Sequence, residues 1–257
     1  MDYFEKIEKP ATDLNWNIPE KKQGSLNVIG GTSESFKNEV KVAEFLNKYP
    51  IAELNLVLPD ALKNKLPNLP NFTFLKSTDS GSFADQDELL NTFNSAEYNL
   101  LLGDLSKNSI TKKAISSAVK SSDKPLLITR DSVDAIAESQ PEKLLMNTNL
   151  CFMASLAQLQ KLLRAVYYPK VLLLSQSLIQ VSEVLHKFTL SYPVAIITLH
   201  NEQILIAKNG EVKAIPLAKS DYSVLMFWQG ELAAKIAAIN LYNPNNFIAA
   251  SISAIFS

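Results

Sequence analysis

The stretch Phe227-Trp228-Gln229-Gly230-Glu231, followed by an apolar run at residues 232–239, decides the fold of this chain. An acid directly after a glycine, at the start of a helix, lies where backbone N–H groups and the helix dipole collect negative charge. The stretch therefore has the outline of a phosphate site. Further on, Asn243 as an N-cap and Pro244 at the first helical position predict a second helix. We expect two helices to close the chain.

The composition predicts one large α/β domain. The chain has 257 residues, of which 47% are apolar, and this is enough for a substantial core. Charged residues make up 20% and the net charge is −1. The chain therefore lacks the excess of positive charge that would attract nucleic acid or an anionic membrane. The N-terminal residues lack a signal-peptide pattern, and no apolar run approaches the ~20 residues of a membrane span. We expect a cytoplasmic protein with no nucleic-acid or membrane partner.

The rare residue types limit the chemistry. Cys151 is the single cysteine, and His186 and His200 are the only histidines, so the sequence predicts neither a disulfide nor a metal site. Cys151 is expected to be a small buried apolar residue. The chain has seven glycines, which is under half of the roughly 7% of average usage. It therefore has few places where bare backbone can lie against phosphate.

Apolar strands that end at glycine or proline and lead into helices repeat along the chain. Residues 1–24 are expected to form an arm over the domain or to be partly disordered, with Trp16 and Ile18 placed to anchor it. A helix with apolar spacing at Phe36, Val40, Ala43 and Leu46 follows the first strand. Strands are predicted at residues 26–29, 53–58, 72–75, 98–102 and 125–129. This alternation predicts a parallel sheet covered on both faces.

The second half of the chain predicts an antiparallel edge on that sheet. Residues 171–174 are either a short strand or the start of the next helix. Three strands are predicted at residues 193–198, 203–207 and 211–215, and Asn209-Gly210 is a strong hairpin signal between the last two. No domain boundary is evident, so residues 25–257 are expected to form a single domain.

Gly230-Glu231 with its helix, and residues 243–250, resemble the C-terminal Gly-Asp helix of the ribokinase-like superfamily. The closest resemblance is to the ADP/ATP-dependent NAD(P)H-hydrate dehydratases, in which a Gly-Thr/Ser-Gly-Asp motif binds nucleotide phosphate and supplies the catalytic carboxylate. Trp228 stands where that family has the first glycine, and Glu231 where it has aspartate. The resemblance implies a three-layer ribokinase-like α/β fold, with a mostly parallel central sheet, helices on both faces and an antiparallel edge.

Further motifs extend the resemblance along the chain. The pair Gly30-Gly31 after the first strand is similar to a Gly-Gly-Ser turn of the family, and Lys37, Asn38 and Glu39 replace the small residues of the next helix. Gly103 and Asp131 occupy the places of a Gly-Pro-Gly and an Asp-Ala-Asp run. No Thr-Pro-His element is recognisable at residues 143–149. His200 lies near the place of a Lys-Gly pair that approaches nucleotide.

The resemblance implies a nucleotide site that takes ADP or ATP with Mg²⁺, with no metal ligand from the protein. Glu231 would be the catalytic acid/base group. The residues implied to contact cofactor or substrate are Gln229, Gly230, Gly30, Gly31, Gly103, Asp131 and His200.

Each of these residues also has a structural interpretation. The helix dipole favours Glu231 without any ligand, and Gly30-Gly31 serves a tight turn. Asp131 is well placed as a helix N-cap. A lone histidine at a strand end, such as His200, is more often a surface or turn residue than a catalyst.

Two hypotheses about function follow. The first is a divergent NAD(P)H-hydrate dehydratase that removes water from hydrated NAD(P)H with ADP or ATP. The second is a non-catalytic ribokinase-fold binding or assembly protein with a degenerate nucleotide site. The orientation of Trp228 separates them, because an indole packed into the would-be nucleotide cleft favours the binding protein and one turned outward favours the enzyme. Exposed Ile252 and Phe256 would in addition indicate a homo-oligomer.

Overall fold

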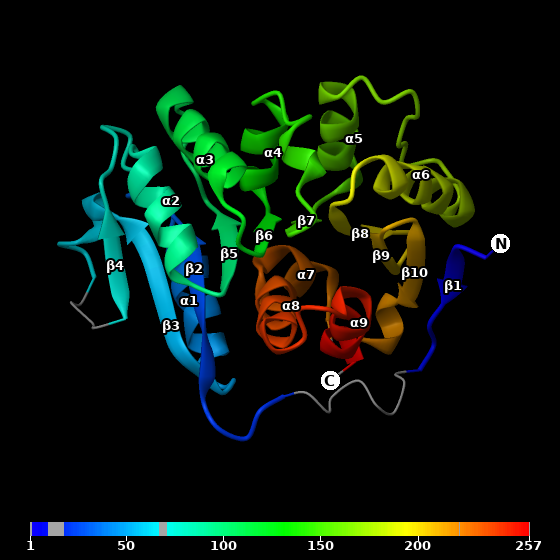
Figure 1. Ribbon diagram of the computed structural model, residues 1–257, viewed down its shortest axis with the longest axis horizontal. Coiled ribbons are helices and arrows are strands. Elements are labelled where there is room, and N and C mark those ends of the chain that lie inside the picture. Colours follow the sequence, from blue (N-terminus) through cyan, green and yellow to red (C-terminus); the bar gives the residue numbers. More distant parts are fainter. Residues whose placement is uncertain (1, 10–17, 67–70, 221, 257) are drawn as a thin grey trace.

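A single ten-stranded sheet forms the centre of the computed structural model, which describes residues 2–9, 18–66, 71–220 and 222–256 (Figure 1). The strands run in the order β1-β10-β9-β8-β7-β6-β5-β2-β3-β4. Their bounds are β1 Phe4–Lys6, β2 Gln23–Gly30, β3 Ile51–Pro59, β4 Phe72–Leu75, β5 Tyr98–Gly103, β6 Leu126–Thr129, β7 Leu150–Met153, β8 Ala195–His200, β9 Gln203–Lys208 and β10 Glu211–Pro216. Only β9 runs antiparallel to its neighbours, β8 and β10, among the paired strands described. The predicted mostly parallel sheet with an antiparallel edge is confirmed.

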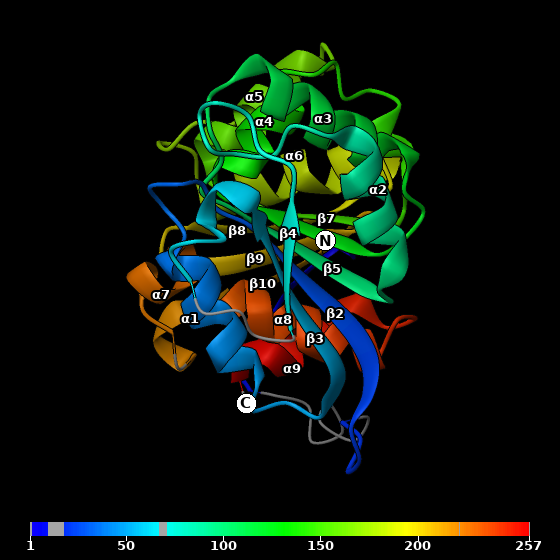
Figure 2. The same ribbon diagram turned by 90° about the vertical axis from the view of Figure 1, so that its left-hand side faces the viewer.

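Helices cover both faces of the sheet, as Figures 1 and 2 show. Their bounds are α1 Lys37–Leu46, α2 Gln86–Ser95, α3 Ser109–Ser121, α4 Asp131–Ala137, α5 Leu156–Ala165, α6 Leu178–Ser191, α7 Val224–Gln229, α8 Glu231–Tyr242 and α9 Phe247–Phe256. Helices α2 to α6 share one apolar core with the sheet, and α1 with α7 to α9 share the other. Every residue of β5 is buried, as expected for a parallel strand covered on both sides. No helix among the described residues is both long and apolar enough to cross a bilayer.

Part of the N-terminal segment belongs to the sheet. Strand β1 pairs in parallel with β10, and the ring of Tyr3 stacks on His186 with 4.0 Å between ring centroids. Ile18 packs against the core, whereas Trp16 lies outside the described residues. Strand β1 thus covers the edge of β10 that would otherwise present unpaired backbone groups.

Two apolar segments differ from expectation. Strand β7 lies between β6 and β8 in the middle of the sheet, although its four residues carried no strand prediction. Residues 171–174 form neither the strand nor the helix start that their composition suggested, and Leu174 is 81% exposed. Helix α6 begins only after Ser177, whose side chain and Gln180 form a capping box. Apolar composition alone therefore failed to identify β7 and wrongly suggested regular structure at residues 171–174.

The C-terminal helices also need a correction. Helix α8 begins at Glu231 as predicted, but α9 begins at Phe247, and Asn243 is the C-cap of α8. The Asn243 side-chain amide donates to Ile239 O at 2.8 Å, so it satisfies a carbonyl of the preceding helix and caps no new one. Ile252 is buried in the monomer, which removes one reason for expecting a homo-oligomer. Self-association remains a prediction.

Candidate functional site

The carboxyl ends of β2, β5 and β6 meet at one edge of the sheet, the edge at which open α/β folds bind ligands. Gly30 ends β2 and Gly103 ends β5, and the Gly31 amide donates to Gly103 O at 2.9 Å. Helix α1 follows β2 across a short loop, and α4 directly follows β6. Side chains from both helices therefore reach the two glycines.

The two glycines leave room for carboxyl groups of the chain itself. A Cβ on Gly30 would lie 2.6 Å from Gly103 O and 2.8 Å from Glu39 Oε1. A Cβ on Gly103 would lie 2.5 Å from Asp131 Oδ1, and the φ of Gly103 is +124°, a conformation that favours glycine. Glycine at both positions therefore permits the close approach of other groups of the chain. The groups that approach are Glu39 and Asp131.

Glu39 is a fully buried acid. It lies on the buried side of α1 with Val42, Ala43 and Leu46, a helical spacing that normally holds apolar residues, and it is 0% exposed. Neither Glu39 oxygen has a hydrogen-bond partner in the described structure. Burial, and then the charge of Asp104, raise the pKa of Glu39 from 4.5 to about 8, while the charge of Arg130 partly opposes the shift. Glu39 is therefore largely protonated at neutral pH.

An ion pair lies beside Glu39, between the loops that follow β5 and β6. Arg130 Nη2 donates to Asp104 Oδ1 at 2.5 Å, Arg130 Nη1 donates to Asp104 Oδ2 at 3.1 Å, and Asn38 Nδ2 donates to the same Oδ2 at 3.2 Å. Asp104 has φ 54° and Arg130 has φ 57°, which L-residues with side chains seldom adopt. Strain of this kind persists where surrounding contacts hold it, and here the two-pronged ion pair does so.

Asp131 completes what we call the carboxyl cluster, which consists of Glu39, Asp104 and Asp131 with Arg130. Asp131 Oδ2 accepts a hydrogen bond from the Leu105 amide at 2.8 Å, whereas Oδ1 is buried without a partner in the described structure. Burial raises the pKa of Asp131, and the Leu105 amide opposes this. The predicted N-cap role is wrong, because Arg130 is the N-cap residue of α4 and Asp131 is the first residue of the helix.

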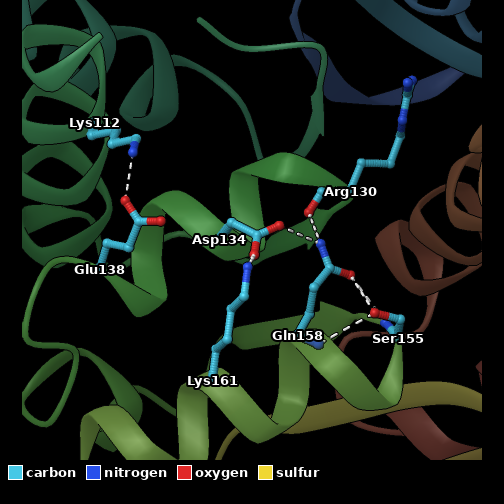
Figure 3. Close-up of polar contacts among 7 residues, drawn as sticks. All are labelled: Lys112, Arg130, Asp134, Glu138, Ser155, Gln158 and Lys161. Carbon is cyan, nitrogen blue, oxygen red and sulfur yellow. Dashed lines mark hydrogen bonds and ion pairs between the residues drawn. The ribbon is translucent and has the colours of Figure 1, made fainter. Parts of the chain in front are cut away.

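Side chains of helix α5 hold the backbone turn at Arg130, as Figure 3 shows. Gln158 Nε2 donates to Arg130 O at 2.6 Å and to Asp134 Oδ2 at 2.8 Å. The other end of the Gln158 amide accepts from the Ser155 amide at 3.1 Å in a capping box. Lys161 pairs with Asp134 on the outer side. One glutamine thus links the start of α5 to the start of α4.

The start of α8 is packed rather than open. Gly230 has φ 101°, and a Cβ there would lie 2.5 Å from Leu102 Cδ1. Helix α7 runs directly into this glycine, and the Phe227 amide donates within it to Ser223 O at 3.0 Å. Trp228 is half-buried against the core, with its ring 4.5 Å from that of Phe227 in an edge-on arrangement. The indole is therefore partly buried against the apolar core that α1 shares with α7 to α9.

The structure brings some of the predicted site residues together. Gly30, Gly31, Gly103 and Asp131 meet directly, and Gly230 lies close by because it contacts Leu102, the residue before Gly103. His200 lies apart at the end of β8, three strands from β5 or ~14 Å at ~4.8 Å per strand. It is 4% exposed and its Nε2 donates to Gln176 O at 2.8 Å, so His200 is a buried residue directly before the turn at Asn201-Glu202, and of the two expected positions the surface one is excluded.

The sequence prediction missed Glu39, Asp104 and Arg130 as members of the site. One signal was available, because an acid at position 39 shares the spacing i, i+3, i+4 and i+7 with Val42, Ala43 and Leu46. An acid on the apolar side of a helix needs an explanation. Within the described ranges, no three His, Cys, Asp or Glu side chains converge as a metal-binding group.

Comparisons with known proteins support the fold through structure alone. No protein-family model matches the chain, and no curated protein matches it. Among solved structures, a hypothetical protein from Streptococcus mutans aligns with a TM-score of 0.70 at 13% identity, over 96% of this chain and 88% of the other. A ribokinase-like superfamily protein from Enterococcus faecalis V583 aligns with a TM-score of 0.66 at 13% identity, over 100% and 87% of the two chains.

An enzyme of the family suggested by the sequence is also similar. The ADP/ATP-dependent NAD(P)H-hydrate dehydratase of Bacillus subtilis, co-crystallised with ATP and Mg²⁺ and soaked with CoA, aligns with a TM-score of 0.58 at 11% identity, over 95% of this chain and 83% of the other. At such identities the likeness concerns the fold. The chain has the ribokinase-like fold.

Proposed function

We propose that the protein is a non-catalytic ribokinase-fold binding protein, whose ligand site is the carboxyl cluster and whose former nucleotide site at Gly230-Glu231 is closed. The Bacillus neighbour binds ATP with Mg²⁺, and dehydration of NAD(P)H hydrate is the activity in its name. In our proposal this chain keeps the architecture and has lost that chemistry.

The packing of Trp228 against the apolar core, beside Phe227, is the observation that supports the proposal most directly. A phosphate at a helix N-terminus needs free backbone N–H groups and a close approach of bare backbone. Here the residues before α8 are themselves helical, the Phe227 amide is used within α7, and the Trp228 indole packs beside Phe227. These features favour a closed phosphate site.

Calorimetric titration with ADP and with ATP, each with Mg²⁺, tests the closed site. We expect no heat of binding at millimolar nucleotide in the wild-type protein. Trp228→Gly restores the residue that the dehydratase family has at this place and serves as the companion variant. Micromolar binding to the wild-type protein, about −8 kcal/mol, would contradict the proposal.

A nucleotide-dependent hydro-lyase is the second candidate, and one observation favours it. Glu231 is the first residue of the twelve-residue helix α8, directly after a glycine in the left-handed conformation, and its side chain is partly exposed. A carboxylate in this place remains available for acid/base chemistry. Turnover of NAD(P)H hydrate with ADP or ATP and Mg²⁺, abolished by Glu231→Gln, would establish this function in place of the first.

A further inference from the structure

Three acceptor atoms at the carboxyl cluster are buried without a donor in the described structure. They are both side-chain oxygens of Glu39 and Oδ1 of Asp131. They come from different elements, α1 and α4, and both carboxyl groups lie against the Gly30 and Gly103 backbone. A buried polar atom without a partner costs about 1–3 kcal/mol, and more when it is charged. Three such atoms at one strand-end edge indicate a missing donor.

The charges of the carboxyl cluster do not balance. It contains three carboxyl groups and one guanidinium group, and Arg130 is already held by Asp104 through two hydrogen bonds. Asn38, which also contacts Asp104, is neutral. Glu39 and Asp131 are therefore left with no cation of their own among these residues. A buried carboxyl group in this position either keeps its proton or takes a cationic partner.

We propose that the carboxyl cluster binds a small ligand through a protonated primary amine, which donates hydrogen bonds to Glu39 and to Asp131 Oδ1. This inference rests on the proposed function and names the class of ligand for that site. An ammonium group has three N–H donors, so one such group can donate to acceptors on both Glu39 and Asp131. A metal ion instead requires its oxygen ligands within about 2.0–2.6 Å of a single point.

The segment at residues 77–83 bridges the two loops that flank the carboxyl cluster. The Ser33 amide, in the loop after β2, donates to Gly81 O at 2.9 Å, and Ser80 Oγ lies 2.9 Å from Ser106 Oγ in the loop after β5. A Cβ on Gly81 would lie 2.3 Å from Ser33 Oγ, so the contact is close. A ligand enters when these hydrogen bonds open, which restricts the site to small molecules.

Calorimetry with butylammonium chloride tests the proposal, with 1-butanol as the neutral probe of similar size. We expect binding of butylammonium to the wild-type protein and none of 1-butanol. Glu39→Gln keeps the shape and removes the charge, and it should raise the dissociation constant tenfold or more, because hydrogen bonds to charged groups are the stronger ones. The matched control is Glu44→Gln, the same change at an exposed position of α1, which should alter the constant less than twofold.

A proton count gives a second readout. Glu39 is mostly protonated at pH 7 when its pKa is about 8, and binding of an ammonium group displaces that proton to solvent. Burial is the largest cause of the raised pKa, and the charged neighbours that also act on it are Asp104, Arg130 and Asp131. Titrations in buffers of different ionisation enthalpy should report release approaching one proton per amine bound, and none in Glu39→Gln.

Absence of butylammonium binding to the wild-type protein, equal binding by Glu39→Gln, or binding without proton release would each overturn the proposal. Magnesium chloride that binds in a Glu39-dependent manner, where butylammonium does not, would assign the cluster to a metal and overturn it too. Nucleotide binding at α8 would refute the proposed function alone, because that titration follows Trp228 and Glu231 rather than Glu39.

Discussion

Glu39, an acid on the buried side of α1, lies beside the backbone of Gly30 at the carboxyl cluster. The glycines at positions 30 and 103 were recognisable because glycine is rare in this chain and these two follow apolar strands. That an acid would occupy the space beside them depends on which side of α1 faces the sheet. The predicted apolar spacing used Phe36 and Val40, which are partly buried, whereas the fully buried stripe begins at Glu39. The buried face of α1 therefore differs from the predicted face by less than one helical turn. Because of this difference, the sequence prediction did not include Glu39 in the site.

The titration of Glu39 predicts a pH-dependent stability. The folded pKa of about 8 lies above the ordinary 4.5, so the stability contributed by the protonated acid is fully present below pH 4.5 and is lost as the pH rises to about 8. The loss is on the order of 5 kcal/mol at 1.36 kcal/mol per pKa unit. Glu39→Gln should therefore gain stability relative to the wild-type protein between pH 5 and pH 8.5. Urea denaturation at both pH values measures the difference, and parallel profiles for the two proteins would contradict the burial of Glu39.

At the scale of elements, the sequence predicted the alternation of strands and helices but not every boundary. Strands such as β5 and β6 end at glycine or lead directly into a helix, and these signals are local. Strand β7 has only four residues, and its place is decided by pairing with β6 and β8, which are distant in sequence. Asn243 fits an N-cap and a C-cap equally by residue type. Only the packing of α8 selects the second role.

Gln158 makes a testable link between elements. It completes the capping box of α5 and also donates to Arg130 O and Asp134 Oδ2. Gln158→Ala should lower the free energy of unfolding by about 3 kcal/mol, at about 1 kcal/mol for each of the three hydrogen bonds lost. Gln180→Ala is the matched control, because Gln180 occupies the same capping-box position in α6 and its Oε1 accepts from Ser177 N. It should cost about 1 kcal/mol or less. Equal losses in chemical denaturation would show that the link to α4 contributes nothing.

At the scale of the whole molecule, the sheet order places the glycines, the carboxyl cluster and the start of α8 at one edge. Strands β6, β5 and β2 are neighbours although they are far apart in sequence, and Gly230 packs on Leu102 of β5. The overall architecture was predictable because each βαβ unit follows local rules. The state of the site was not, because it depends on the packing of Trp228 and Glu39 between elements.

Removal of residues 1–9 tests the role of β1 at the sheet edge. The deletion breaks the pairing of β1 with β10, the Lys213–Glu5 ion pair at 2.8 Å and the stacking of Tyr3 on His186. Exposed strand edges pair with other chains, so the shortened protein should unfold at a lower temperature and self-associate. Thermal unfolding and analytical ultracentrifugation measure both effects. A control that lacks only residues 1 and 2 should behave as the full chain, and identical behaviour of the longer deletion would show that β1 does not protect the edge.

Titration of the purified protein with ATP and Mg²⁺ in the calorimeter tests the proposed function most directly. We propose that the ribokinase-like fold is retained while the phosphate site at Gly230-Glu231 is closed by α7 and Trp228. We therefore expect no heat of binding at millimolar ATP. Micromolar binding that weakens in Glu231→Gln would contradict it, and would place a nucleotide at the start of α8.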